Sequence, residues 1–143
     1  MLNMTAIQGR ISTDLAVEYT PGKQIPYCKF RVAVDRDYLS EGNQRRTDFL
    51  SCIAWKERAS FAAKCFSKGD MVIVRGRLEE DTWSDREGNK RSRMIINVDS
   101  VYFGETKQAR EARKNRTADP SDLPPEYSGN EFAEDFDDAQ LPF

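Results

Sequence analysis

Two stretches of the chain alternate between apolar and polar side chains with a period of two, and this pattern constrains the fold most. In residues 27–36, the apolar face carries Cys28, Phe30, Val32 and Val34. In residues 47–55, one face carries Leu50, Cys52 and Ala54, and the opposite face carries Phe49, Ser51, Ile53 and Trp55. Because successive side chains of a strand point to opposite faces of a sheet, both stretches are predicted strands. The second stretch is apolar on both faces, which predicts a packed core behind it and a contact surface in front of it.

Three further runs have strand character. Residues 4–11 form a predicted first strand, in which Gly9 would tolerate the close approach of another backbone. Residues 71–80 and 94–98 also place apolar side chains at every second position. The faces expected to be apolar carry Val72, Val74 and Leu78 in the first run and Met94, Ile96 and Val98 in the second.

One helix is predicted between the third and fourth strands, within residues 56–69. Its apolar positions recur at helical spacing and are Ala59, Ala62, Ala63 and Phe66. Gly69 is the predicted C-terminal stop. A closed five-stranded barrel would protect the edges of such short strands. The position of the helix favours the OB-fold, a five-stranded Greek-key barrel, over an SH3-like barrel, which needs no such helix, or a β-sandwich, which needs more strands.

Charge divides the chain into a basic body and an acidic tail. Residues 1–103 carry 17 Lys and Arg against 14 Asp and Glu, whereas residues 104–143 carry 5 against 10. Residues 117–143 hold eight acids and no base. We therefore divide the chain into an OB-fold domain over 1–103, a disordered linker over 104–134 that begins with a basic and partly helical stretch, and an acidic tip over 135–143. This asymmetry is typical of proteins that bind polyanions.

The three cysteines predict a reducing environment. Cys28, Cys52 and Cys65 are odd in number, form no CxxC pair and fall in apolar segments, so we expect buried free thiols. No apolar run is long enough to span a membrane, and the N-terminus has no secretory pattern. We expect a cytoplasmic, nucleoid-associated protein.

Catalysis is not expected. The chain contains no histidine, which removes the commonest general base and the usual nucleophilic triads. It has no phosphate-binding glycine loop with the required spacing, so we expect no cofactor. The consecutive acids Glu79, Glu80 and Asp81 indicate a solvated strand end and not a catalytic pair.

Aromatic and cationic residues are interleaved along the predicted barrel. Unpaired bases stack on rings while cations track phosphates, so this pattern indicates single-stranded nucleic acid, although such rings also occur in cores and subunit contacts. The stacking candidates are Tyr38, Phe49, Trp55 and Trp83. The phosphate-binding candidates are Arg10, Arg31, Arg36, Arg45, Arg46, Lys56, Arg75, Arg77, Arg86, Lys90, Arg91 and Arg93.

Several short motifs occur in the order and spacing of a known family. They are GRI at 9–11, YTPGK at 19–23, FRVAVDRDY at 30–38, TDFLSCIAWKERA at 47–59, KGDMVIVRGRL at 68–78, TWSDREGNKR at 82–91 and DDAQLPF at 137–143. In these motifs the chain resembles the bacterial and phage single-stranded DNA-binding protein family, over essentially its full length. The resemblance implies an OB-fold, usually a homotetramer, that wraps single-stranded DNA without sequence preference.

The resemblance also implies a role for the end of the chain. In the family, an acidic tip with a closing apolar–Pro–Phe docks onto replication, repair and recombination proteins. Here that role would fall to Asp135, Asp137, Asp138, Leu141, Pro142 and Phe143. Two other functions stay open: an interaction hub whose barrel mainly assembles subunits, and an OB-fold that binds RNA. The outward positions of Ile53 and Ile73 would permit a subunit interface.

Overall fold

The structure is a computed structural model of the chain and describes residues 1–39, 42 and 44–116. Its elements are β1 (Thr5–Ile11), β2 (Glu18–Tyr19), β3 (Pro26–Leu39), β4 (Arg45–Trp55), α1 (Glu57–Cys65), β5 (Met71–Ser84), β6 (Lys90–Phe103) and α2 (Lys107–Arg116). None of the described helices is long and apolar enough to cross a membrane.

Five of the strands close into a barrel. Strand β1 pairs antiparallel with both β3 and β5, the β3–β4 and β5–β6 hairpins are antiparallel, and β4 runs parallel to β6. This closes the ring β1–β3–β4–β6–β5, with the short β2 added at the edge of β3. With α1 between β4 and β5, this is the predicted OB-fold.

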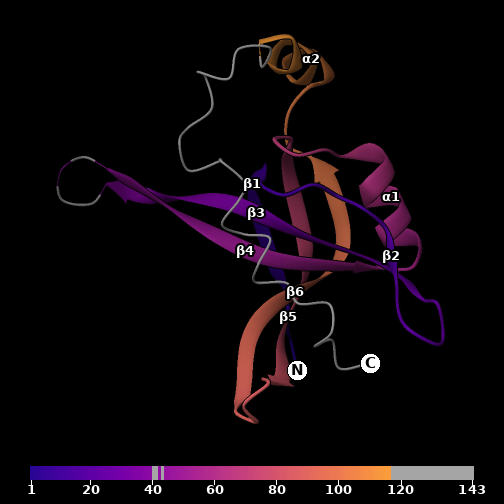
Figure 1. Cartoon of the computed structure of the whole chain (residues 1–143). Coiled ribbons are helices and arrows are strands. Elements are labelled where there is room, and N and C mark those ends of the chain that lie inside the picture. Colours follow the sequence, from indigo (N-terminus) through magenta and orange to yellow (C-terminus); the bar gives the residue numbers. More distant parts are fainter. Residues whose placement is uncertain (40–41, 43, 117–143) are drawn as a thin grey trace.

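Two of the ladders in this ring are short seams. Between β1 and β3, Arg10 is aligned with Ala33 and Ile11 with Val32. Between β4 and β6, Cys52 is aligned with Ile96 and Ile53 with Asn97. The two hairpins continue beyond the barrel as projecting arms that leave it in different directions (Figure 1).

Gly9 confirms the prediction of a close backbone approach. A Cβ added there would lie 2.2 Å from the carbonyl oxygen of Ala33, so the β1–β3 seam needs a glycine. Gly76 serves β5 in the same way, because a Cβ there would lie 2.1 Å from the carbonyl oxygen of Asn97, next to a shift in the β5–β6 register.

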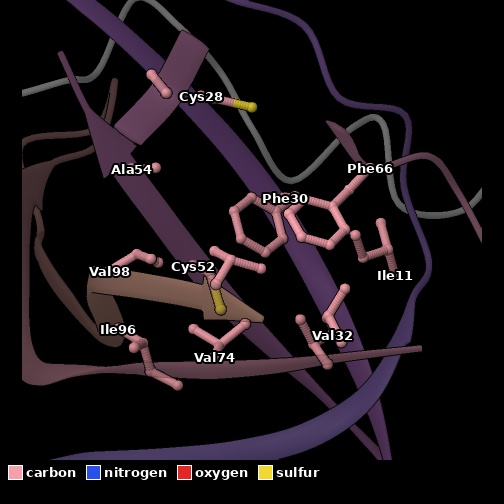
Figure 2. Packing of buried hydrophobic residues seen from close by; sticks show 13 residues of the cluster. Ile11, Cys28, Phe30, Val32, Cys52, Ala54, Phe66, Val74, Ile96 and Val98 are labelled. Carbon is pink, nitrogen blue, oxygen red and sulfur yellow. The ribbon is translucent and has the colours of Figure 1, made fainter. Parts of the chain in front are cut away.

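The interior is filled by the predicted inward faces of β3 and β4 together with α1 and the β5–β6 hairpin (Figure 2). Its members include Ile11, Cys28, Phe30, Val32, Cys52, Ala54, Phe66, Val72, Val74, Ile96 and Val98. Leu78 and Met94 share the predicted apolar faces of these strands but are not buried: Leu78 is 41% exposed and Met94 is 58% exposed. Strands β5 and β6 run past the rim of the barrel, where none of the described residues forms an opposite wall over these two side chains.

Helix α1 covers one end of the barrel with Ala59 and Ala62. It ends at Cys65, because Phe66 already has an extended backbone, with φ −121° and ψ 155°. The prediction that Gly69 stops the helix was therefore wrong. Gly69 instead forms the turn before β5, with φ +92° and its N–H donating to the carbonyl of Ile11 at 2.7 Å.

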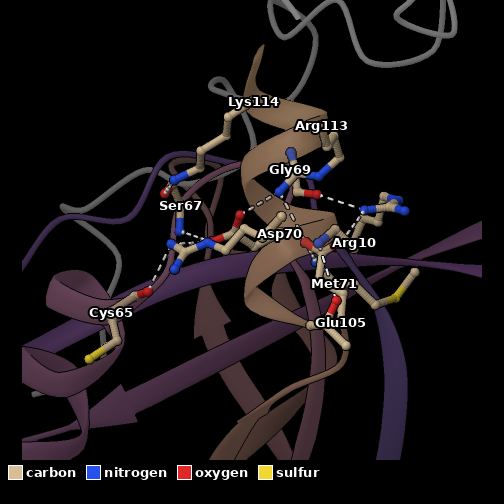
Figure 3. A network of polar contacts seen from close by, with 12 residues as sticks. Arg10, Cys65, Ser67, Gly69, Asp70, Met71, Glu105, Arg113 and Lys114 are labelled. Atoms are coloured by element: carbon tan, nitrogen blue, oxygen red, sulfur yellow. Dashed lines mark hydrogen bonds and ion pairs between the residues drawn. The ribbon is translucent and has the colours of Figure 1, made fainter. Parts of the chain in front are cut away.

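The first part of the predicted linker is folded onto the barrel. Residues 107–116 form α2, and two of its arginines bind one fully buried carboxylate (Figure 3). Arg110 lies 2.8 Å from Asp70 Oδ2, and Arg113 lies 2.6 Å from Asp70 Oδ1 and 3.1 Å from Glu105 Oε1. This stretch was predicted to be basic and partly helical but was assigned to the linker; the structure folds residues 107–116 as α2, because its arginines are partners of a buried charge.

Asp70 is stabilised in its ionised form. Burial alone would raise its pKa, but the Ser67 N–H at 2.9 Å and the guanidinium groups of Arg110 and Arg113 outweigh burial and hold the pKa below its ordinary value. The remainder of the predicted linker and the acidic tip, residues 117–143, lie outside the described residues.

Candidate nucleic-acid interface

The outer face of β4 carries an aromatic platform. Trp55 is half-buried, and its ring packs against Tyr27 of β3, with centroids 5.6 Å apart and planes inclined by 47°. The two residues are directly aligned in the β3–β4 register. Ile53 and Ile95 complete a small second cluster beneath them, so part of the Trp55 ring is fixed and part is accessible.

This cluster corrects one expectation. Ile53 points outward as the pattern predicts, but it is only 5% exposed because Tyr27, Ile95 and Trp55 cover it. It therefore cannot offer its side chain to another subunit. Tyr27 is an aromatic residue of this surface that was not among the candidates from the sequence. It lies two residues before Lys29 in β3 and therefore on the same outward face, and this alternation was the available signal.

Tyr38 and several cations occupy the β3–β4 arm. The Tyr38 side chain is 60% exposed, and its hydroxyl accepts a 2.8 Å hydrogen bond from Arg36 Nη1. Arg36 also binds both oxygens of Asp48, at 3.0 and 2.9 Å, and this contact holds the pKa of Asp48 below its ordinary value. Because Phe49 follows Asp48 directly, the half-buried Phe49 points to the other face of the arm. Exposed Arg45 and Arg46 lie nearby on the same arm.

Trp83 lies near the end of β5, on the second arm, which is the β5–β6 hairpin. The Arg93 guanidinium carbon is 5.1 Å from the centre of its half-buried ring, a cation–π contact. Arg93 Nε also lies 3.2 Å from Asp81 Oδ2, which fixes the guanidinium beside the ring. The arm therefore presents a Trp ring with a positioned cation.

Ion pairs organise the tip of this second arm. Asp85 accepts the backbone N–H groups of Asn89 and Glu87 at 2.8 and 3.0 Å and lies 3.2 Å from Arg91 Nε. The Asn89 N–H bond, followed by Arg91 and the Glu87 N–H, lowers the pKa of Asp85 against the opposing effect of burial. Farther from the tip, where β5 aligns Arg77 with Asn97 of β6, Arg77 pairs with Glu79 at 2.8 Å. Exposed Arg86 and Lys90 lie at the tip beside Asp85.

The remaining candidate cations are scattered. Arg75 is exposed in mid-strand, with Nη2 3.4 Å from Ser100 Oγ, and Lys56 is exposed at the junction of β4 and α1. Arg31 is half-buried in β3. Arg10 donates to the carbonyl of Gly69 at 3.0 Å and lies 3.7 Å from Glu105, so it belongs to the α2 contact network and not to either arm.

This arrangement suits an extended polyanion with planar groups. Residues 1–116 carry all 22 Lys and Arg of the chain but only 16 of its 24 Asp and Glu, so the part of the chain that reaches α2 is basic. Within the described residues, no group of acidic or cysteine side chains could hold a metal ion. The interface therefore offers aromatic rings on which planar groups can stack and cationic side chains that can pair with anions.

Residues 2–104 match the model of the single-strand binding protein family. The chain belongs to this family. Its barrel, its two arms and the rings on them all fall within the matched range. Members of the single-strand binding protein family are DNA-binding proteins and not enzymes, which confirms the expectation that the chain is not an enzyme.

Individual relatives agree with this assignment. The chain is 33% identical to the single-stranded DNA-binding protein of Caldanaerobacter subterraneus subsp. tengcongensis, over the whole of both chains. It is 33% identical to that of Oceanobacillus iheyensis, over 75% of this chain and 66% of the relative. It is 30% identical to single-stranded DNA-binding protein A of Bacillus subtilis, over 75% of this chain and 62% of the relative.

Proposed function

We propose that the protein binds single-stranded DNA without sequence preference, by stacking unpaired bases on outer rings and pairing phosphates with the cations of the two arms. The observation that carries this proposal is the accessible position of Trp55, Trp83 and Tyr38 outside a barrel whose core is complete without them. Stacking on such rings contributes roughly 1–3 kcal/mol per base and tolerates every base.

Titration with oligo(dT) tests the proposal, with Trp fluorescence as the readout, because Trp55 and Trp83 are the only tryptophans of the chain. Binding should quench the fluorescence, and the affinity should fall steeply as salt rises. An unchanged signal at low salt would contradict the proposal. Parallel titration with poly(U) at equal salt separates DNA binding from the RNA alternative.

We further propose that the protein acts as a homotetramer. Several large apolar side chains outside the core are exposed, and they are Met1, Leu2, Met4, Leu78 and Met94. The Asn3 side chain bonds both backbone groups of Leu78, at 2.8 and 3.1 Å, which places the N-terminal segment beside β5. These are the exposed apolar side chains that contact with a second copy of the chain would cover. Sedimentation with and without oligo(dT) measures the assembly, and Met94→Glu should weaken it.

The cellular role that we propose is protection of single strands on the nucleoid during replication, recombination and repair, with partner recruitment through residues 135–143. The acids would steer the encounter, and Leu141 and Phe143 would fill an apolar pocket of the partner. Deletion of residues 135–143 should abolish recruitment while single-stranded DNA affinity persists or rises slightly. Loss of DNA binding on deletion would contradict this division of roles.

A further inference from the structure

The platform beside Trp55 and the ring of Trp83 share one continuous outer face. The platform rests partly on Ile95 of β6, which is aligned with Glu79 of β5. Because the β5–β6 register has no shift from this pair to the tip, every second residue of both strands lies on the same face as Ile95. On β5 these residues are Glu79, Asp81 and Trp83. The direct path between the two tryptophans on this face therefore crosses two acids.

Each of the two acids is paired with an arginine of the same arm. Glu79 Oε1 lies 2.8 Å from Arg77 Nη2, and both carboxylate oxygens of Glu79 accept from Asn97 Nδ2, at 3.1 and 3.2 Å. Asp81 Oδ2 lies 3.2 Å from Arg93 Nε, and these two residues are directly aligned across the arm. Two candidate phosphate-binding arginines are therefore neutralised by fixed carboxylates before any ligand binds.

The fold itself gains little from these acids. The side chains of Glu79 and Arg77 are 41% and 55% exposed, and an ion pair in contact with water contributes little to stability. Arg93, the partner of Asp81, likewise lies outside the hydrophobic core. An acid on a face that meets a polyanion also repels the phosphates. An effect on the ligand therefore explains the two acids better than an effect on the fold.

We propose that Glu79 and Asp81 limit the affinity for single-stranded DNA by cancelling the charges of Arg77 and Arg93. This inference rests on the proposed single-stranded DNA binding and assigns to it two residues that set its strength. A guanidinium whose charge is cancelled displaces no counterion from the strand, so the two arginines add nothing to the salt dependence of binding. Binding along this path then depends on base stacking more than on charge.

The decisive variants are Glu79→Gln and Asp81→Asn, which keep the shape of each side chain and remove one negative charge. Each should release one arginine for a phosphate while the melting temperature changes little. For each altered chain that contacts the strand, the slope of log K against log[salt] should become steeper by about 0.7. If binding is equal near about 1 M salt, this slope makes the oligo(dT) affinity roughly eightfold higher at about 0.05 M.

A double-variant cycle separates charge cancellation from a structural effect. Arg77→Gln alone leaves the charge of Glu79 unopposed, so it should lower the oligo(dT) affinity below that of the unaltered protein. Arg77→Gln combined with Glu79→Gln should return the salt slope to that of the unaltered protein, because the pair has no net charge in either. A shallower slope in the combined variant would show that Arg77 contacts a phosphate in spite of Glu79, and would overturn the inference.

Glu80→Gln is the matched control. Glu80 lies between the two acids in sequence but points to the opposite face of β5, where it is exposed. Its substitution removes the same charge and should leave the salt slope close to that of the unaltered protein. Unchanged or lower affinity in both Glu79→Gln and Asp81→Asn would overturn the inference, as would an equal gain in Glu80→Gln. Failure of the unaltered protein to bind oligo(dT) would instead defeat the proposed function itself.

Discussion

The ring of Tyr27 lies against the ring of Trp55, so that an aromatic residue with only 3% of its surface exposed supports one that remains accessible. A base-stacking ring outside a barrel needs such support, because a ring that rotates freely would lose conformational entropy whenever a base bound. The Trp55 ring is instead held in place before any ligand arrives.

Trp55→Ala should therefore affect both binding and stability. We expect oligo(dT) affinity to fall by about 1–3 kcal/mol. The unfolding free energy should also fall, because Tyr27, Ile53 and Ile95 lose a covering group. Fluorescence-polarisation titration and urea unfolding measure the two effects. Trp55→Phe, which keeps a ring, should recover most of both, and full affinity in Trp55→Ala would remove Trp55 from the interface.

Trp83→Ala should separate binding from stability. Trp83 lies on the β5–β6 arm and contacts Arg93 rather than the barrel core. Affinity should fall by roughly 1–3 kcal/mol while the melting temperature changes little. Phe61→Ala is the control, since Phe61 is a 47% exposed ring on α1. If Phe61→Ala reduced the affinity as much as Trp83→Ala, the arm would have no special role.

Asp70→Asn should release α2. Removing one partner of a buried ion pair typically costs about 3–5 kcal/mol. Here it removes the charge that Arg110 and Arg113 share, and Arg113 keeps only Glu105 as a carboxylate partner. Urea unfolding of the full chain measures the loss. Asp99→Asn, at an exposed acid on β6, should be nearly neutral. Equal stability of Asp70→Asn and the unaltered protein would mean that the network does not hold the helix.

The same carboxylate should make stability depend on pH. The pKa of Asp70 is lower in the folded chain than in the unfolded chain, where it is about 3.9. Its contribution is therefore fully present above about pH 4–5 and is lost as the pH falls through the lowered folded value. The stability difference between the unaltered protein and Asp70→Asn should shrink over that acidic range. A constant difference down to about pH 2 would contradict this assignment.

The thiols should react in a fixed order. Burial raises the pKa of Cys28 to about 11 and that of Cys52 to about 12, and both side chains are buried, whereas Cys65 is partly exposed. An alkylating reagent near neutral pH should therefore modify Cys65 first, because the thiolate is the reactive form. Mass spectrometry follows the reaction, and all three should react alike in urea. Rapid labelling of Cys52 in the native protein would show that the barrel opens.

Period-two patterns predicted the barrel wall well, for a simple reason. The faces of β3 and β4 depend on neighbours within the same strand, so Phe30 and Cys52 could be assigned to the core from local alternation alone. The same rule gave Leu78 and Met94 the right strand face but could not show that they are exposed, because it cannot say where a strand extends beyond the barrel. Gly9 could be recognised as a close approach, since glycine in a strand has few other uses.

Features that depend on distant partners were not predictable. Helix α2 is very polar, and its docking needs Asp70, a buried acid about forty residues earlier in the chain. The platform beneath Trp55 needs Tyr27, which only the β3–β4 register brings alongside. Lys56 has a positive φ of 56°, and nothing in the sequence indicates it, because lysine does not favour positive φ.

The two short seams of the barrel have a mechanical consequence. Each hairpin is a stiff ribbon with a long ladder, whereas the ribbons are joined at β4–β6 by the Cys52–Ile96 and Ile53–Asn97 pairs. The angle between the arms is therefore governed by a narrow hinge line. A strand of DNA that contacted Tyr38 on one arm and Trp83 on the other would restrict the angle between the arms. The backbone amide hydrogens of the β4–β6 pairs should then exchange more slowly in the complex than in the free protein.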